Sequence, residues 1–331
     1  MVANISMDNG NSTQKVKSDT KEENYPNRLK IYDENPSHRN LFSDSKKAHR
    51  TVYEVNNKKY VLDEEGIGSG SRNENRYETD LYLAEVLIGM SKVTEHEKIR
   101  LALTLPTEHY KDLEISEKIK ERFKGVHKLT IDNVRHTYDI QHVSVLPQGY
   151  LCLVDYIMED DHMILNNKHK YTYLIVDIGA GTLDIVETKG LSIVSCMGGN
   201  IGSMDFNKNY LRRINNNQAV ISDKIKFTLD DIDFIPQQEI YKNMKRYDFT
   251  KEYQETCKEL AEKIQNHLNR NGIDFSDYDR VLYCGGTSLL IQDYLYKPRN
   301  ARVYKDALMG NARGGYKYIT YKYSKGGQEN G

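Results

Sequence analysis

The chain has 331 residues and a formal net charge of −1, with 38% hydrophobic and 29% charged residues. This length fits two domains better than one, and the composition is typical of globular chains. Because the net charge is near zero, the chain as a whole lacks the excess positive charge that favours direct nucleic-acid binding. No stretch reaches the roughly 18 apolar residues of a membrane span, so membrane insertion is not expected either.

The cysteines and the first residues both indicate the cytoplasm. Cys152, Cys196, Cys257 and Cys284 are widely spaced and form no Cys-x-x-Cys pair or zinc pattern. The chain enters a predicted strand almost at once, without the basic and apolar regions of a signal peptide. We therefore expect a cytoplasmic protein with reduced, mostly buried thiols.

The first part of the chain alternates strand and helix patterns. Period-two or short apolar runs predict strands at residues 2–7, 99–105, 129–138 and 141–146, and a hairpin at 51–62. Helical spacing predicts helices at 76–93 and 107–124, the second with Tyr110, Leu113 and Ile119 buried. The polar segment 17–50 is predicted to form loops and edge strands.

A new pattern begins after Pro147-Gln148-Gly149. We predict a helix at 150–158, a loop at 160–170, and strands at 171–176, 183–189 and 191–197. A helical run passes through Phe206, Tyr210 and Ile214, whereas residues 215–247 give no assignment. The apolar stripe of 249–268 is the clearest helix, and a strand follows at 280–284. The polar tail 324–331 is expected to be disordered.

Two similar turns follow predicted strands and lie far apart in the chain. They read Asp8-Asn9-Gly10-Asn11-Ser12-Thr13-Gln14-Lys15 and Asp177-Ile178-Gly179-Ala180-Gly181-Thr182-Leu183-Asp184. Glycine permits tight turns and close approach of backbone amides to a ligand, and amides with hydroxyls can bind phosphate oxygens. An aspartate at a strand end can hold a metal ion through water. The pair predicts two related lobes that grip one nucleotide phosphate chain.

Two further features extend this prediction. Gly285-Gly286-Thr287 lies between a predicted strand and a helix beginning near Ser288. It is either an ordinary strand-to-helix turn or a surface for a base and ribose, and the two other turns favour the nucleotide interpretation. Lys15 could reach back to the phosphates, or it could be a solvated strand lysine.

Gln148 and Asp184 are the candidate catalytic residues. Gln148 follows Pro147 at a predicted lobe junction, where an amide side chain could orient an attacking water. Asp184 lies seven residues after Asp177 and could position or polarise that water. The alternative for Asp184 is a surface acid that pairs with a lysine.

These motifs, in this order, resemble the superfamily of actins, heat-shock chaperones and sugar kinases. The two Asp-Gly turns resemble its phosphate loops, Gly285-Gly286-Thr287 its adenosine loop, and Pro147-Gln148-Gly149 and Asn311-Ala312-Arg313-Gly314 its connecting segments. Within the superfamily, the chain is most similar to the bacterial actins that segregate plasmids, the ParM type. Leu105-Pro106 before a helix and an acid seven residues after the second-turn aspartate carry that likeness.

The resemblance implies an α/β, actin-like fold of duplicated RNase H-like lobes with a nucleotide cleft between two domains. The first lobe would comprise 1–149 plus 310–331, and the second 150–309. ATP or GTP would bind with Mg²⁺, which Asp8 and Asp177 hold through water, while Gln148 and Asp184 act in catalysis. The nucleotide-binding residues would be Asn9, Gly10, Asn11, Ser12, Thr13, Lys15, Gly179, Ala180, Gly181, Thr182, Gly285, Gly286 and Thr287.

The implied function is that of a filament-forming nucleoside triphosphatase whose hydrolysis follows assembly and drives plasmid DNA segregation. Its partners would be further copies of itself and a DNA-binding adaptor protein at a centromere-like site. Two alternatives stay open: a soluble phosphotransferase or polyphosphate phosphatase of the same superfamily, and a non-catalytic nucleotide-binding scaffold.

Overall fold

The computed structural model describes residues 2–32, 51–62, 74–159, 167–232 and 236–324. Expectations for 33–50, 160–166 and 325–331 therefore fall outside the described residues. The chain divides into two compact units. Unit 1 comprises Met1–Thr104, Asp112–Val145 and Ile319–Gly331, and unit 2 comprises Leu105–Lys111 and Leu146–Tyr318. The expected lobe boundaries, 1–149 with 310–331 and 150–309, stay a prediction.

Unit 1 is built on a nine-stranded sheet. Its strand β1 pairs antiparallel with β2 and parallel with β7. The order across the sheet is β3 (Glu22–Pro26), β2 (Thr13–Ser18), β1 (Ala3–Asn9), β7 (Lys98–Leu105), β9 (Val134–Pro147), β8 (Gly125–Ile131), β5 (Tyr53–Val55), β6 (Lys58–Leu62) and β4 (Leu29–Ile31). The predicted strands at 2–7 and 99–105 are confirmed.

Two hairpins of unit 1 turn on residues with positive φ. Asn56 and Asn57 have φ of 51° and 61°, and this turn confirms the predicted hairpin at 51–62. Asp132 and Asn133, with φ of 46° and 71°, turn the chain between β8 and β9. The prediction of one strand over 129–138 was wrong at that point, because Asp and Asn tolerate this conformation without a glycine signal.

The helices of unit 1 begin at side-chain caps. Helix α1 (Asp80–Val93) follows the 3-10 helix η1 (Glu74–Glu78), and the Thr79 hydroxyl accepts the Tyr82 N–H. Asp112 caps α3 (Leu113–Phe123), so the predicted helix at 107–124 is divided into α2 (Thr107–Tyr110) and α3. The prediction that Leu113 is buried was wrong, because this first residue of α3 is 77% exposed.

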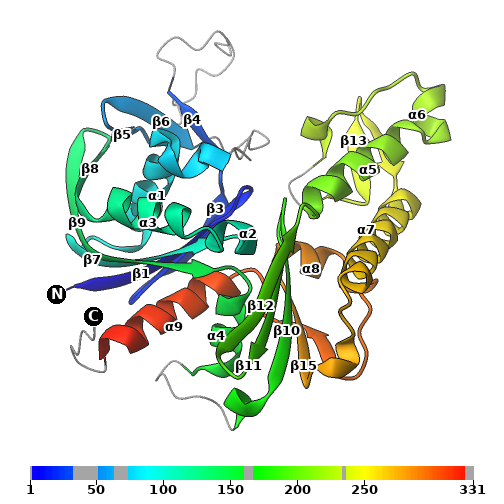
Figure 1. Cartoon of the computed structure of the whole chain (residues 1–331). Coiled ribbons are helices and arrows are strands. Elements are labelled where there is room, and N and C mark those ends of the chain that lie inside the picture. The colour runs from blue at the N-terminus through cyan, green and yellow to red at the C-terminus, as the bar shows by residue number, and fades with distance from the viewer. Residues whose placement is uncertain (1, 33–50, 63–73, 160–166, 233–235, 325–331) are drawn as a thin grey trace. The chain divides into compact units, whose positions relative to one another are not determined.

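Unit 2 contains a five-stranded sheet whose strands β10, β11 and β15 are largely buried (Figure 1). Its order is β12 (Ser192–Gly199), β11 (Leu183–Lys189), β10 (Thr172–Ile178), β15 (Arg280–Cys284) and β16 (Ala301–Val303). Strands β10, β15 and β16 are parallel, whereas β10, β11 and β12 are antiparallel neighbours. Along β10, Leu174 and Val176 enter one core and Tyr173 and Ile175 enter the other. This explains why the strand is a continuous apolar run.

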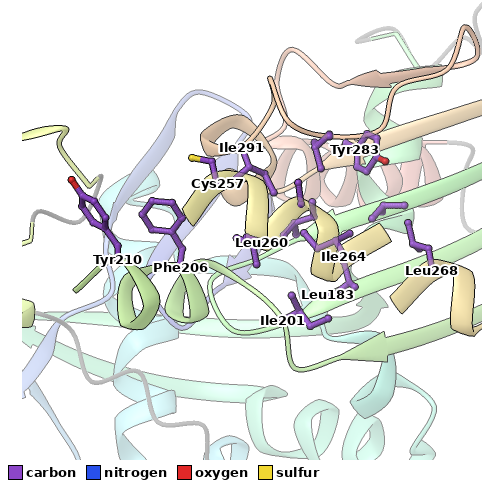
Figure 2. Close-up of a cluster of buried hydrophobic side chains, with 14 of the residues drawn as sticks. Leu183, Ile201, Phe206, Tyr210, Cys257, Leu260, Ile264, Leu268, Tyr283 and Ile291 are labelled. Carbon is purple, nitrogen blue, oxygen red and sulfur yellow. The ribbon is translucent and has the colours of Figure 1, made fainter. Parts of the chain in front are cut away.

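The larger core of unit 2 packs two amphipathic helices on one face of this sheet (Figure 2). Helix α7 (Thr250–Arg270) contributes Cys257, Leu260, Ile264 and Leu268, which recur every three or four residues. Helix α5 (Ser203–Asn215) contributes Phe206 and Tyr210 from its own apolar stripe. Each fully buried leucine or isoleucine stabilises the fold by roughly 1.5–3 kcal/mol. The predicted helix at 249–268 is confirmed.

Helix α4 (Tyr150–Ile157) packs on the other face of the sheet and is crossed by α9 (Gly310–Ser324). A Cβ on Gly314 would lie 1.8 Å from the Leu151 carbonyl oxygen, so the two backbones touch there. The remaining elements are η2 (Lys168–Lys170), α6 (Gln218–Ser222), η3 (Leu229–Asp231), β13 (Glu239–Lys242), β14 (Lys245–Asp248), η4 (Phe275–Asp277) and α8 (Gly286–Leu290). Segment 215–247, which the sequence left unassigned, thus holds a short helix and a hairpin.

All four cysteines are free thiols, and Cys152, Cys257 and Cys284 are buried while Cys196 is half-buried. The expectation of mostly buried thiols is confirmed. Within the described ranges, every helix falls short of the length and hydrophobicity that a membrane crossing requires.

Candidate functional site

The first Asp-Gly turn joins β1 to β2 in unit 1. Asp8 is 3% exposed at the end of β1, and the Thr104 hydroxyl donates to its Oδ1 at 2.9 Å. Lys15 lies directly across the strand pair from Asp8, and its Nζ is 2.9 Å from Asp8 Oδ2. Lys15 is therefore not a solvated strand lysine: it places a positive charge against the buried carboxylate at the mouth of the turn.

A buried polar network holds the backbone of this turn from behind. Asn9 Oδ1 accepts hydrogen bonds from Arg76 Nη2 at 2.8 Å, from Asn27 Nδ2 at 3.3 Å and from Gln14 Nε2. Asn27 also donates from Nδ2 to the Gly10 carbonyl oxygen at 2.9 Å. The Asn9 side chain thus points into the protein, and a nucleotide-binding role for Asn9 would have to rest on its backbone.

Arg76 links this network to helix α1. Its Nη2 is 2.9 Å from Glu85 Oε2, and its Nη1 donates to Asn11 Oδ1 at 2.7 Å. Arg76 and Glu85 are 9% and 7% exposed, so the ion pair is buried beneath the turn. Removing one member of such a pair leaves an uncompensated buried charge, which makes the shape of the turn depend on both.

The second turn joins β10 to β11 in unit 2 and repeats the strand arrangement of the first. Asp177, 4% exposed, accepts a hydrogen bond at 2.7 Å from Nδ2 of Asn311, the second residue of α9. Asn311 Oδ1 in turn accepts the Gly149 N–H at 3.0 Å, so one buried amide joins the end of β10 to the start of α4. A neutral side chain therefore orients this carboxylate.

Asp184 lies across the strand pair from Asp177, at the position that Lys15 occupies opposite Asp8. It is 2% exposed, and its Oδ1 accepts the Thr107 N–H at 2.6 Å and the Thr107 hydroxyl at 2.8 Å. Asp184 is therefore buried, which contradicts the alternative interpretation of it as a surface acid. Two buried carboxylates lie opposite each other at this turn, and Thr107 and Asn311 donate hydrogen bonds to them.

The backbone of the second turn is closed on itself and fixed by two helices. The Gly179 N–H donates to the Thr182 carbonyl oxygen at 2.9 Å. The Met204 N–H, in the first turn of α5, donates to the Ala180 carbonyl oxygen at 2.9 Å, and the Thr287 hydroxyl of α8 donates to the Gly179 carbonyl oxygen at 2.7 Å. The predicted residues Gly179, Ala180, Thr182 and Thr287 therefore belong to one hydrogen-bonded assembly, whereas Gly181 is buried within the same turn.

Gly285 lies against the end of β10. Its φ of 79° is in the left-handed region, and a Cβ there would lie 2.3 Å from the Ile178 carbonyl oxygen and 2.4 Å from Asp177 Oδ1. Only glycine fits this position without displacing the Asp177 carboxylate. Gly286, the first residue of α8, is exposed. The third motif is thus in contact with the second turn, as nucleotide binding by both would require.

Gln148 ends the strand-to-helix connection between β9 and α4. Its N–H donates to the Leu105 carbonyl oxygen at 2.8 Å, which fixes its backbone beside the end of β7. The side chain is half-buried, and Gly149, with φ of 76°, follows it and donates to Asn311. Gln148, Asp177 and Asp184 therefore all lie within unit 2, and Asn311 hydrogen-bonds both Asp177 and Gly149, the residue after Gln148.

Two buried thiols adjoin this carboxylate assembly. Cys152 Sγ contacts Asn311 Oδ1 at 3.4 Å, and Cys284 directly precedes Gly285. Burial raises the pKa of the Cys152 thiol well above its ordinary value, and burial also raises the pKa of Cys284. Both thiols are therefore protonated near neutral pH and act as apolar packing groups, since the thiolate is the reactive form.

Four residues beside the predicted site were missed from the sequence as contributors. Thr107, Thr104, Arg76 and Asn311 each hydrogen-bond a predicted site residue from a distant part of the chain. The sequence indicates Asn311 only as part of a connecting segment, and the Leu105-Pro106 motif directly precedes Thr107. No local pattern identifies the other two, because their partners lie 67 or more positions away.

Two family models match the chain, one over each part. Actin like proteins N terminal domain matches residues 6–150, and Plasmid segregation protein ParM, C-terminal, matches residues 165–309. Between them the two models cover most of the chain, which therefore belongs to the ParM-type actin-like proteins. No curated protein matches it.

Solved structures show the same fold at low identity. The apo pSK41 ParM protein is 18% identical, with a TM-score of 0.72 and 98% of each chain covered. An archaeal actin homologue in complex with ADP is 15% identical, with a TM-score of 0.74 and 97% of this chain and 100% of that chain covered. A 15-stranded ParM filament from Clostridium botulinum is 14% identical, with a TM-score of 0.71 and coverage of 97% and 99%. The fold of the present chain is actin-like.

Proposed function

We propose that this chain is a cytoplasmic nucleoside triphosphatase that polymerises with ATP or GTP and hydrolyses it to drive plasmid segregation. The observation that carries the proposal is the pair of buried carboxylates, Asp177 and Asp184, opposite each other beside the Gly179–Thr182 turn. Like charges directly across a strand pair are unfavourable, so their presence favours a function over a purely structural role. The ADP complex of one structural relative and the filament of another support the proposal.

Magnesium fits the residues that are present. Among the described residues, no group of three or more His, Cys, Asp or Glu side chains could hold a metal ion. Mg²⁺, however, is commonly bound through one or two carboxylates together with water and substrate phosphates. Asp8 and Asp177 would hold it through water, and the ion would neutralise charge on the phosphates.

The protein groups would act by positioning and by electrostatics. Backbone amides of the two turns, with Ser12, Thr13 and Thr182, bind the phosphates, and Lys15 adds positive charge. The Gly285-Gly286-Thr287 segment accommodates the base and ribose.

Gln148 orients a water molecule for in-line attack on the γ-phosphorus, while Asp184 polarises that water. The bond from the γ-phosphorus to the bridging oxygen breaks, releasing phosphate and the nucleoside diphosphate.

The assembly partners would be further copies of the chain and a DNA-binding adaptor protein at a centromere-like site. The formal net charge of −1 supports an adaptor over direct DNA contact. Hydrolysis after assembly would then make filaments transient.

The test follows light scattering and phosphate release in parallel after addition of ATP or GTP with Mg²⁺. Scattering that rises and then falls as phosphate appears is the expected result. Phosphate release without scattering would instead indicate a soluble phosphotransferase or phosphatase, and nucleotide binding without either signal would indicate a scaffold.

The variant Gln148→Ala should slow hydrolysis by about 10²- to 10³-fold and leave stable filaments. Gln141→Ala is a matched control, because Gln141 lies earlier on β9 and donates to Asp139 instead. Equal rates of disassembly in the wild type and Gln148→Ala would remove Gln148 from the mechanism.

A further inference from the structure

A concave site lies in unit 2, at the end of the parallel strands β10 and β15 that is farther from Asp177. It is a pocket of about 600 Å³ whose lining includes Arg280, Arg299 and Arg302. Arg280 begins β15, whose other end is Cys284, next to Gly285. Four residue steps of about 3.3 Å separate the two ends by roughly 13 Å. The arginine pocket, as we call this site, is therefore distinct from the candidate nucleotide site.

The walls of the arginine pocket are built by two loops that are tied together. Asn300 Nδ2 donates to the carbonyl oxygens of Phe275 at 2.7 Å and Tyr278 at 2.8 Å. The Phe275 and Tyr296 rings lie 5.6 Å apart, and the Tyr283 hydroxyl donates to the Tyr296 carbonyl oxygen at 2.9 Å. These contacts preform the pocket, so a ligand would not have to order it.

The charges of the arginine pocket are unbalanced. Its three arginines face a single lining carboxylate, Asp274, whose Oδ1 already accepts the Ser276 N–H at 2.9 Å and hydroxyl at 2.8 Å. Arg280 Nη1 donates to the Asp279 carbonyl oxygen at 2.7 Å. Within the described ranges, neither Arg299 nor Arg302 forms a side-chain hydrogen bond or an ion pair. The surface therefore presents two guanidinium groups available to an external anion.

The positive charge of Arg302 also acts on a neighbouring lysine, Lys168. The pKa of Lys168 is lowered, first by burial and then by the positive charge of Arg302. The Lys168 ammonium instead lies over the Tyr156 ring at 4.0 Å and donates to the Tyr156 carbonyl oxygen. The positive charge of Arg302 therefore disfavours a second cation beside it, while Glu159 acts on Lys168 in the opposite direction.

We propose that the arginine pocket binds an acidic segment of a partner protein. Guanidinium groups form paired hydrogen bonds to carboxylates, and arginine and tyrosine are the side chains most enriched at energetically important interface positions. Tyr296, which is 57% exposed, supplies the aromatic surface beside the arginines. Recognition of acidic motifs by arginine clusters is a recurrent mode of peptide binding.

Asp274 distinguishes a peptide from other anions. A peptide brings backbone N–H donors that can satisfy the Asp274 carboxylate, whereas inorganic phosphate or a nucleic-acid backbone brings mainly negative oxygens towards it. The pocket is also bounded by exposed side chains, so a small ion would keep much of its water there. The proposal goes beyond the nucleotide chemistry and does not depend on hydrolysis.

The experiment measures binding of a short fluorescein-labelled peptide of alternating glutamate and alanine to the full chain by fluorescence anisotropy. The glutamine–alanine peptide, inorganic phosphate and a short DNA duplex serve as competitors. The glutamate peptide should bind, salt should weaken it, and the double variant Arg299→Ala/Arg302→Ala should bind at least about tenfold more weakly. Arg212→Ala, which removes an exposed arginine of α5, should bind as the wild type does.

Three outcomes would overturn the proposal: equal binding of the glutamine peptide, unchanged binding by the double variant, or stronger competition by phosphate or DNA than by unlabelled glutamate peptide. Arg299 and Arg302 are exposed, so melting curves should coincide with those of the wild type. If they do not, Arg299→Gln/Arg302→Gln repeats the measurement with a polar, uncharged side chain at each position. Phosphate release measured on the same samples separates failure of this site from failure of the proposed hydrolysis.

Discussion

The two Asp-Gly turns have the same strand arrangement but opposite electrostatics. In each, the aspartate ends a strand that pairs antiparallel with the next strand and parallel with a later one. Across the strand pair, Asp8 meets Lys15 at 2.9 Å, whereas Asp177 meets a second acid, Asp184. The same strand arrangement thus carries an ion pair in unit 1 and two carboxylates in unit 2. This difference favours phosphate binding by the first turn and water activation by the second turn.

The side chains that support the two turns also differ in charge. The first turn rests on the buried ion pair of Arg76 and Glu85, which reaches it through Asn9 and Asn11. The second rests on uncharged groups, chiefly Asn311, which reaches Asp177. Removing one partner of a buried ion pair leaves an uncompensated charge and costs much stability. Removing one partner of a neutral hydrogen bond costs less. The first turn should therefore be the more sensitive to loss of its support.

The largest expected effect comes from removing the charged support. Arg76→Ala leaves Glu85 buried without its cation, and we expect it to lower the free energy of unfolding by about 3–5 kcal/mol. Asn311→Ala should lower it by about 1–3 kcal/mol, because it leaves neutral and partly compensated groups. Urea unfolding of both variants measures the difference. The comparison fails if Asn311→Ala is as destabilising as Arg76→Ala.

Exchange of charge at the paired positions should separate binding from catalysis. Asp184→Asn keeps an oxygen for Thr107 but removes the second carboxylate, and we expect phosphate release to fall by about 10²- to 10³-fold, or about 2.7–4 kcal/mol. Lys15→Gln should instead weaken nucleotide binding by about tenfold, or about 1.4 kcal/mol, with a smaller effect on the rate at saturation. Phosphate release against nucleotide concentration resolves the two, and identical profiles for the variants would contradict the division of roles.

The glycines of the two units differ in the strain that a side chain would cause. Gly285→Ala would require a left-handed alanine and a Cβ 2.3 Å from the Ile178 carbonyl oxygen, with an expected loss of about 1–3 kcal/mol. A Cβ on Gly10 would lie 2.8 Å from the Thr13 carbonyl oxygen, without a left-handed φ, so Gly10→Ala should lose less. Thermal melting of the two single variants tests this order, which a greater loss in Gly10→Ala would reverse.

Much of this fold was predictable because its signals are local. Strands 183–189 and 280–284 were predicted at the ends that the structure gives, since apolar runs bounded by glycine or charge mark them. The Asp132-Asn133 turn was missed because it lacks the glycine that a tight turn usually shows. Leu113 was misplaced because helical spacing does not reveal that a residue begins the helix at an exposed edge.

The candidate site was predictable only in part, for the same reason. The glycine turns are local motifs, and their positions follow from the strands that precede them. That Asp184 accepts from Thr107, or that Asn9 accepts from Arg76, depends on contacts across 77 and 67 positions of the chain. Such contacts arise from tertiary packing, which no spacing of residue types in one sequence encodes.

The smallest expected effect is a change in the labelling rate of a cysteine. All four cysteines lie in unit 2. Cys152 is fully buried against Asn311, and burial raises its pKa, so a thiol reagent should label it only when unit 2 opens locally. Asn311→Ala removes this contact and should speed labelling of Cys152 a few-fold, as read by mass spectrometry of the labelled peptide. Arg76→Ala, whose effect belongs to unit 1, should leave the labelling rate unchanged under conditions where the variant stays folded. If both variants speed labelling equally, the two turns are not supported independently. One shared network would then support both turns.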